Sequence, residues 1–237
     1  MPRIAVCGCN GVDKPSFVKH FLKHFPMYRK IGEAYKDIVS KKEVFGSKEL
    51  QLKILNSMID EIITVDKTDN VIMSHTILDN LVDSMWLNAH LYPLKISDVD
   101  DKFVQQSVKL VKEALHFFDL IIWLPKVNSY DIRYENDNDA VYDDEIDNFF
   151  AAIEETYTKG KEFLFEFSSP DGAPGMIQVF GDSEERMNMV KLYLDPQTGD
   201  FLGKVASDSL IQLPPDLESQ VLFDTIAKQI SASKGEK

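Results

Sequence analysis

Cysteine is scarce in this sequence: only Cys7 and Cys9 occur among 237 residues. Because cysteine is one of the residue types most often buried, we expect both to be structural. We do not expect them to pair with each other. A metal site built on them would need further ligands. The five histidines form no ligand-spaced cluster with them; these are His20, His24, His75, His90 and His116. The sequence therefore predicts neither a disulfide framework nor a cysteine-based metal centre.

Long apolar runs are also absent. The longest, such as residues 120–124, fall far short of the ~20 residues that a membrane span needs. The N-terminal residues lack the apolar core of a signal peptide. We therefore expect a cytoplasmic protein without a membrane segment.

Basic residues are outnumbered. Lysine and arginine number 26 against 39 aspartates and glutamates, which gives a formal net charge of -13 at pH 7. That charge repels polyanions, so nucleic acid is a disfavoured partner. The densest acidic stretch, residues 135–147, holds seven carboxylates and no lysine or arginine. We expect it to be a solvated loop that leads into a helix.

The composition that is present is that of a globular protein, with 44% hydrophobic and 27% charged residues. A chain of 237 residues can bury a full-sized core and does not require a second domain. We therefore expect one domain that spans residues 1–237.

Strand and helix periodicities alternate along this chain. The expected strands cover residues 3–8, 70–73, 120–124 and 176–180. The expected helices cover residues 14–25, 47–63, 76–90 and 98–117, and a further helix follows residue 181. The uninterrupted apolar run at 120–124 is typical of a central strand in a parallel sheet that is covered on both faces. The pattern predicts an α/β fold, a doubly wound parallel sheet flanked by helices.

The C-terminal part follows another pattern. Turn residues at 195–199 separate two short apolar segments, which predicts a β-hairpin over residues 192–205. A helix is expected at 217–230. We interpret residues 190–237 as an addition to the core, made of a C-terminal hairpin and helix. The exposed hairpin edge is the expected surface for self-association, which would give a homodimer.

The segment after the first expected strand fits a phosphate-binding loop. Such a loop, G-x-x-x-x-G-K-[ST], joins a strand to a helix, because backbone N–H groups and the helix N-terminus must converge on phosphate oxygens. Gly8, Gly11 and Lys14 match this pattern in type and spacing. Lys14 would bring positive charge to the β and γ phosphates, and Gly11 would permit close approach of the backbone.

Two loop positions depart from the pattern. Asp13 stands where glycine is usual, and at ~4 Å with an effective dielectric of ~20 its repulsion of a phosphate is roughly 4 kcal/mol, unless it pairs with Lys14. Pro15 stands where the magnesium-binding serine or threonine belongs, so Ser16 would have to substitute. We therefore expect ATP with Mg²⁺ to bind weakly or with an unusual metal dependence. The alternative is that the segment is merely a tight turn between strand and helix.

With this loop, three further stretches resemble the P-loop kinase-like ATPase family of bacteria and phages, which is related to nicotinamide riboside kinases and to deoxynucleoside and deoxynucleotide kinases. Residues 25–38 resemble the family's acidic segment after the first helix, where a glutamate followed by a basic residue faces the phosphate acceptor. Glu33 and Lys36 are the matching positions. The resemblance implies that both bind the acceptor and that Glu33 is the catalytic base.

Residues 74–81 resemble the Asp-Arg-[Ser/Thr] segment that follows the family's third strand. Here Ser74 and His75 replace the aspartate and the arginine. His75 would supply a weaker, pH-dependent charge toward the acceptor. The metal candidates are Ser16, Ser74 and Asp79. Asp79 has an alternative role, in which it is solvated or pairs on its own helix.

Residues 118–125 resemble the strand before the family's lid, and Arg133, followed by acidic residues at 143–147, matches the lid arginine. Residues 177–186 resemble the strand and helix that flank the adenine. The resemblance covers residues 3–195 in one consistent order, which implies the P-loop NTPase fold.

The resemblance implies a nucleotide-metabolism enzyme with ATP and Mg²⁺ as cofactors. Its catalytic candidates are Lys14, Arg133 and Glu33. Its nucleotide-binding candidates are Gly8, Asn10, Gly11, Asp13, Lys14, Ser16 and Arg133. We expect the side chains of Lys14 and Arg133 to face solvent in the empty site, so that removing either costs turnover but not folding.

Three functions remain open from the sequence. The first is ATP-dependent phosphoryl transfer to a nucleoside, a nucleotide or a related small-molecule acceptor. The second, favoured by Asp13, Pro15, Ser74 and His75, is a kinase-like fold that has lost turnover and serves as a nucleotide-binding or protein-interaction module. The third, known among phage relatives, is a kinase acting on a modified base in DNA, and the net charge of -13 counts against it. A phage-encoded protein would act in the host cytoplasm.

Overall fold

The computed structural model describes residues 2–39, 46–66, 68–126, 137–158, 173–200 and 202. Its strands are β1 (Arg3–Cys7), β2 (Arg29–Ile31), β3 (Val71–Met73), β4 (Leu120–Trp123) and β5 (Gly175–Gln178). Its α-helices are α1 (Lys14–His24), α2 (Lys36–Val39), α3 (Lys48–Ile63), α4 (Ile77–Trp86), α5 (Asp101–Leu115), α6 (Asp137–Thr158) and α7 (Ser183–Val190). A 3₁₀ turn, η1 (Asn10–Val12), precedes α1, and a π-helical turn, η2 (Leu87–Leu91), follows α4.

The strands form one sheet in the order β2-β3-β1-β4-β5, and every neighbouring pair is parallel. This confirms the predicted doubly wound parallel sheet. After β1 the chain builds β2 and β3 on one side and then crosses to build β4 and β5 on the other. In such sheets ligands bind outside the carboxyl ends of the strands, at the point where the strand order reverses. The end of β1 is that point.

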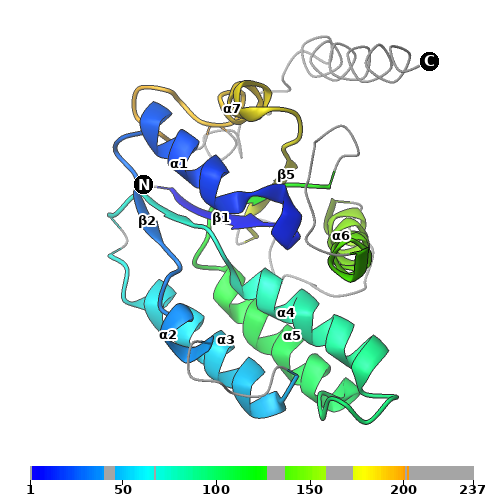
Figure 1. Ribbon diagram of the computed structural model, residues 1–237. Helices are drawn as coiled ribbons and strands as arrows, with labels where there is room; N and C mark the ends of the chain where they lie inside the picture. The colour runs from blue at the N-terminus through cyan, green and yellow to red at the C-terminus, as the bar shows by residue number, and fades with distance from the viewer. Residues whose placement is uncertain are drawn as a thin grey trace, which may run out of the picture.

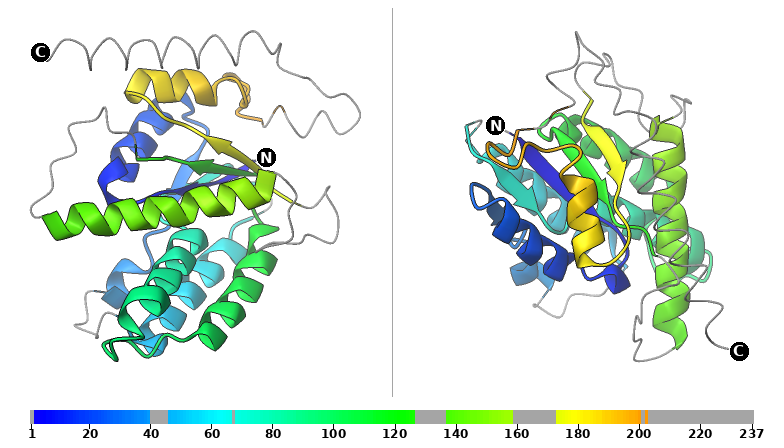
Figure 2. Two further views of the ribbon diagram at one scale, coloured as in Figure 1. Left: turned by 90° about the vertical axis from the view of Figure 1, so that its right-hand side faces the viewer. Right: turned by 90° about the horizontal axis from the view of Figure 1, so that it is seen from above.

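Helices cover both faces of the sheet. Helices α1 and α7 lie together on one face, and α3, α4, α5 and α6 lie on the other (Figures 1 and 2). Helix α6 contacts β5, α4 and η1. It therefore lies beside the turn that follows β1.

The core is built on the central strands, as their apolar runs predict. All four residues of β4 are buried, and in β1 only Arg3 is partly exposed. A strand that is buried on both faces has a continuous apolar sequence, because its side chains pack against a layer of helices on each side of the sheet. Cys7 and Cys9 are buried and unpaired, as expected.

Two elements differ from the expectation. Strand β2 was not predicted, because only one of its three residues is buried and no apolar run marks it. The acidic stretch was expected to be a solvated loop that leads into a helix, but from Asp137 onward it already belongs to α6, and Asp143 is only 3% exposed. The apolar side chains Ile146, Phe150 and Ile153, which are buried, hold this helix against the core.

Within the described residues, no helix is both long enough and apolar enough to cross a membrane. Residues 195–200 form the predicted turn, in which the N–H of Asp195 donates to the carbonyl of Asp200 over 2.9 Å. The N–H of Leu202 donates to the carbonyl of Tyr193 over 2.8 Å. The rest of the predicted hairpin and the helix at 217–230 lie outside the described residues, so the C-terminal addition stays a prediction.

Candidate functional site

The loop between β1 and α1 requires glycine at its first position. Gly8 has φ of +143°, and a Cβ there would lie 2.5 Å from the carbonyl oxygen of Leu124. Only glycine permits both the positive φ and this close approach. The loop thus leaves β1 directly over the end of β4, at the switch point of the sheet.

Asp13 is the N-cap of α1. Its backbone is left-handed, with φ of 52° and ψ of 53°, a conformation that explains why glycine is usual there and that aspartate tolerates better than most residues. Its side chain accepts a hydrogen bond from the N–H of Ser16 over 3.2 Å. The carboxylate therefore caps the helix, and within the described residues it forms no ion pair with Lys14.

Lys14 is buried. Its Nζ lies 3.1 Å from Asp79 Oδ1 and donates to the carbonyls of Gly8 and Cys9. Burial disfavours its charge, but the Asp79 carboxylate outweighs that effect and raises the pKa of Lys14. The expectation that Lys14 faces solvent was wrong: it is 6% exposed, because the loop folds its side chain back onto the start of α4.

Asp79 joins the loop to the first turn of α4. Its Oδ1 also accepts the N–H of Gly8 over 3.3 Å. Its Oδ2 accepts the N–H and the hydroxyl of Thr76 over 2.7 and 2.8 Å, which completes a capping box. Asp79 is not solvated, since it is 4% exposed, and its ionic partner is Lys14 of the loop and not a residue of its own helix. A role in metal binding stays a prediction.

A carboxylate from α6 accepts hydrogen bonds from the backbone amides of the loop. Asp143 Oδ1 accepts the N–H of Asn10 over 3.2 Å, and its Oδ2 accepts the N–H of Gly11 over 2.7 Å. These are the amides that the loop pattern assigns to phosphate oxygens. Two N–H groups that converge on one carboxylate form an anion site, and here the chain supplies its own anion.

Asp83 and Tyr142 lie beside this anion site. The hydroxyl of Tyr142 donates to Asp83 Oδ1 over 2.7 Å. Burial raises the pKa of Asp83 to about 6, since it disfavours the charged carboxylate. Burial also raises the pKa of Tyr142, as does the Asp83 carboxylate. A carboxyl that titrates near neutral pH is suited to proton transfer.

These groups enclose a small pocket at the carboxyl edge of the sheet. It is lined by Gly8, Cys9, Asn10, Lys14, His75, Asp79, Asp83, Tyr142, Ile146 and Phe150. Its volume is about 10 Å³, room for about one water molecule. A phosphate group would fit only if α6 or its side chains moved.

His75 lies over the ring of Tyr35, with ring centroids 4.3 Å apart. Burial lowers the pKa of His75, so the ring is neutral at pH 7. As a neutral group, His75 can form a hydrogen bond with the molecule that accepts the phosphoryl group. It does not replace the charge of an arginine. Its role in acceptor binding stays a prediction.

Glu33 follows β2 and forms ion pairs with Lys30 and Lys36. Its hydrogen bonds to Lys30 and then to Lys36 lower the pKa of Glu33, and the partner bond raises the pKa of Lys36. A carboxylate held in this way is a weak base until its partners leave. Glu33 is not among the residues that line the pocket at the loop.

The remaining sequence candidates are Ser16, Ser74 and Arg133. Ser16 is exposed on the first turn of α1, and Ser74 is buried after β3. Arg133 lies outside the described residues, so its role as a lid arginine stays a prediction.

Sequence reasoning missed Asp83 and Asp143. The available signal for Asp143 was helical spacing: it lies three residues before the buried Ile146 and seven before the buried Phe150. That spacing places it on the apolar face of α6, where a carboxylate needs partners. Nothing in the sequence indicated that the partners would be the loop amides.

No family model matches the chain, and no curated protein matches it in sequence. Among solved structures, the chain is similar to deoxyadenosine kinase from M. mycoides with products dCMP and a flexible dCDP bound, at 15% identity and a TM-score of 0.50, covering 80% of this chain and 97% of that one. The same kinase with bound dCTP matches at 14% identity and a TM-score of 0.47, covering 80% and 97%. With bound dATP it matches at 15% identity and a TM-score of 0.47, covering 81% and 98%. With the strand order, the first likeness shows an α/β fold of the P-loop NTPase type, as the sequence implies.

Proposed function

We propose that this chain transfers a phosphoryl group from ATP to a nucleoside, a nucleotide or a related small metabolite. One observation carries the proposal: the N–H groups of Asn10 and Gly11 converge on the two oxygens of Asp143. Donors arranged in this way suit a phosphate group as well, because both ligands present anionic oxygens to backbone amides. The likeness to a nucleotide-bound kinase supports the same reading at the level of the fold.

A nucleotide has to displace Asp143 from the loop. Asp143 already accepts the loop N–H groups, and the neighbouring pocket of about 10 Å³ has no room for a phosphate. The exchange replaces one anion by another on the same donors, so the loop backbone does not need to refold. Its cost is the movement of part of α6.

Lys14 is the residue that would stabilise the transferring phosphoryl group. Charge builds on the phosphoryl oxygens in the transition state, and an ammonium placed there lowers the barrier electrostatically. In the empty site this ammonium is paired with Asp79 over 3.1 Å. Lys14 therefore has to exchange part of that contact for a phosphate oxygen.

The carboxylates around Lys14 fit a magnesium ion in their chemistry, since Mg²⁺ prefers oxygen ligands and is held by one or two carboxylates together with phosphates. A displaced Asp143 would hold it, with Asp79 and the hydroxyl of Ser16 as further candidates. Bound there with ATP, Mg²⁺ would neutralise phosphate charge. It would also offset the repulsion between ATP and these aspartates.

Two carboxylates are candidates for the base. In the transfer, the acceptor hydroxyl oxygen forms a bond to the γ phosphorus, the bond to the bridging oxygen breaks, and the hydroxyl proton passes to a carboxylate. The family resemblance assigns this proton to Glu33. Asp83, with a pKa of about 6, is the better matched to neutral pH and lies nearer to Lys14 in the pocket.

The second candidate function is a binding module without turnover. It is favoured by the same Asp143 contact, if that contact is permanent, and by Pro15 in place of the metal-binding hydroxyl. A kinase acting on a base in DNA is disfavoured by the net charge of -13.

Calorimetric titration of ATP with Mg²⁺ tests the proposal, on the wild type and on Asp143→Asn. The variant keeps the shape of the side chain but removes the charge that competes with phosphate. Hydrogen bonds to a charged group contribute roughly 1.5–3 kcal/mol, so we expect ATP to bind about tenfold or more tightly to Asp143→Asn. Asp144→Asn is the matched control, because Asp144 lies next on the helix and contacts Lys126, not the loop.

An ATP-consumption assay over a panel of nucleosides and nucleotides completes the test. Acceptor-dependent ATP consumption by the wild type supports the transferase. Tighter binding by Asp143→Asn without any acceptor-dependent consumption supports the binding module. Failure of both proteins to bind ATP at millimolar concentration contradicts the assignment of the loop as a nucleotide site.

A further inference from the structure

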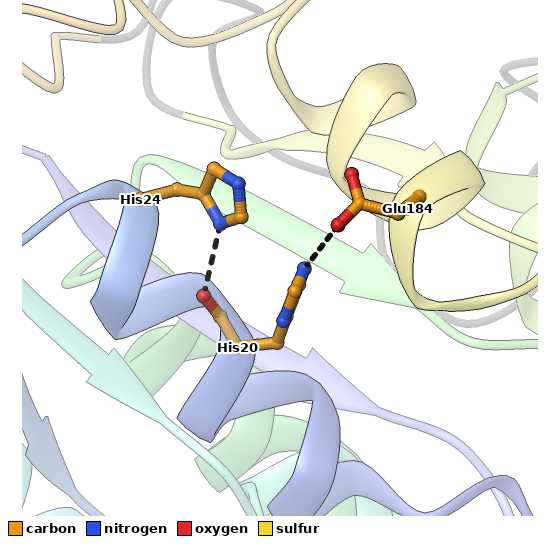
Figure 3. Close-up of side chains that lie close together, drawn as sticks. All are labelled: His20, His24 and Glu184. Carbon is orange, nitrogen blue, oxygen red and sulfur yellow. Dashed lines mark hydrogen bonds and ion pairs between the residues drawn. The ribbon is translucent and has the colours of Figure 1, made fainter.

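A second polar cluster lies away from the loop, between α1 and α7. His20 and His24 are one helical turn apart on α1, and Glu184 belongs to the first turn of α7. Figure 3 shows the two imidazole rings and the carboxylate turned toward one another across the gap between the helices. One ligand atom from each lies within 4.8 Å of the others.

The ring of His24 is already oriented for a metal. Its Nδ1–H donates to the carbonyl oxygen of His20 over 3.2 Å, since a carbonyl can only accept. That bond fixes the tautomer in which Nε2 carries a free lone pair. Metal-binding histidines are commonly held in this way, by a hydrogen bond from the other ring nitrogen.

The ring of His20 points its Nε2 at the carboxylate. Nε2 lies 3.5 Å from Glu184 Oε1 and, within the described residues, has no hydrogen-bond partner although solvent does not reach it. The helix dipole favours a basic residue at the end of a helix and an acidic residue at its start. It therefore accounts for the position of His24 on α1 and, separately, for that of Glu184 on α7. It does not explain why a sheltered imidazole nitrogen is left without a hydrogen-bond partner.

We propose that His20, His24 and Glu184 bind one Zn²⁺ ion, with water as the fourth ligand. Ligands bonded at about 2.1 Å to a tetrahedral Zn²⁺ lie about 3.4 Å apart, so the cluster has to close by roughly 1 Å. The Glu184 side chain is 70% exposed and free to make that adjustment by a change of rotamer. Two imidazoles with one carboxylate favour zinc and its transition-metal neighbours over Mg²⁺ or Ca²⁺.

The ion would join α7 to α1. Helix α7 also reaches the loop directly, because Arg186 Nη1 donates to the carbonyl of Val12 over 3.0 Å. A metal between the helices would therefore fix the element that supports the turn after β1. This role does not depend on phosphoryl transfer.

Zinc titration of the full chain by calorimetry tests the site, with Mg²⁺ as the comparison ion and with Co²⁺ to report tetrahedral coordination by its visible absorption. We expect one Zn²⁺ per chain, and an affinity more than about tenfold weaker in His20→Gln and in His24→Gln, since loss of a ligand should exceed the 10- to 100-fold effect of an outer-shell change. His116→Gln is the control, because His116 is exposed and lies on another part of the surface.

Melting temperature provides a second readout. Zn²⁺ should raise it in the wild type and in His116→Gln, and should not raise it in His20→Gln, because binding to the folded state alone stabilises that state. Circular dichroism without metal verifies that the variants fold. Equal zinc affinity in the wild type and both ligand variants, or no tetrahedral Co²⁺ spectrum in the wild type, overturns the site.

Discussion

The loop side of the candidate site and the proposed acceptor side hold their charges in opposite ways. On the loop side, the side chains of Lys14, Asp79 and Asp143 are buried, and each has several polar contacts. On the acceptor side, Lys36 is exposed and Glu33 is half-buried, and the two form an ion pair at the surface.

The difference determines what a substitution can reveal. A buried charge that loses its partner is left without water, and the cost falls on folding. A surface ion pair contributes little, because water replaces the lost contact. Changes on the loop side therefore test fold and chemistry together, while changes on the acceptor side test chemistry alone.

The largest effect is expected for Lys14→Ala. The substitution leaves Asp79 buried without its counter-charge. Removing one partner of a buried ion pair lowers the unfolding free energy by about 3–5 kcal/mol. Urea unfolding measures it. Turnover should also fall by about 10²- to 10³-fold. The double variant Lys14→Met with Asp79→Asn should recover much of the stability, and a loss below about 1 kcal/mol in Lys14→Ala would show that the pair is solvated.

A smaller effect, confined to acidic pH, is expected for Asp83→Asn. Burial raises the pKa of Asp83 from 3.8 to about 6, so the folded state binds a proton that the unfolded state has released. This contribution to stability is complete below pH 3.8 and is lost as the pH rises to about 6, a change of up to about 3 kcal/mol. Asp83→Asn should remove this part of the dependence of the unfolding free energy on pH.

Urea unfolding at several pH values from 4 to 7, compared between the wild type, Asp83→Asn and the control Asp144→Asn, measures the slope. Because other carboxylates titrate in the same range, the informative quantity is the difference between the wild type and each variant. A constant difference between the wild type and Asp83→Asn across this range would mean that Asp83 has an ordinary pKa in the folded protein.

The smallest effect on stability is expected for Glu33→Gln. Its ion pairs lie at the surface, so the unfolding free energy should change by less than about 0.5 kcal/mol. If Glu33 is the base, turnover should nevertheless fall by about 10²- to 10⁴-fold. Glu49→Gln, which removes a similar surface pair with Lys53, is the control for both measurements. Unchanged turnover in Glu33→Gln, with a loss in Asp83→Asn, assigns the proton to Asp83.

The fold was largely predictable from the sequence because the central strands have a clear local sequence signal. The apolar runs in β1 and β4 and the glycine-rich segment after β1 required no long-range information. Strand β2 escaped because two of its three residues, Arg29 and Lys30, are exposed and polar, and its pairing with β3 is a tertiary event.

The candidate site was predictable only in part, for a related reason. The loop and Lys14 follow from a local pattern, but the partner of the loop amides is 132 or 133 residues away in sequence. A run of carboxylates is usually solvated, and local composition does not show which member turns inward. The burial of Lys14 was missed likewise, because it depends on Asp79, which the pattern treats as a helix residue.

Asp79 divides its two oxygens between two tasks. Oδ2 receives both bonds from Thr76, whereas Oδ1 faces the loop and Lys14. When an anion draws Lys14 away, Asp79 keeps the donors that cap α4, so the helix start is not disturbed. The departing ammonium also leaves behind a carboxylate that attracts it back. Asp79 therefore competes with any bound anion for the Lys14 ammonium. This competition lowers the affinity of the loop for that anion and favours its release.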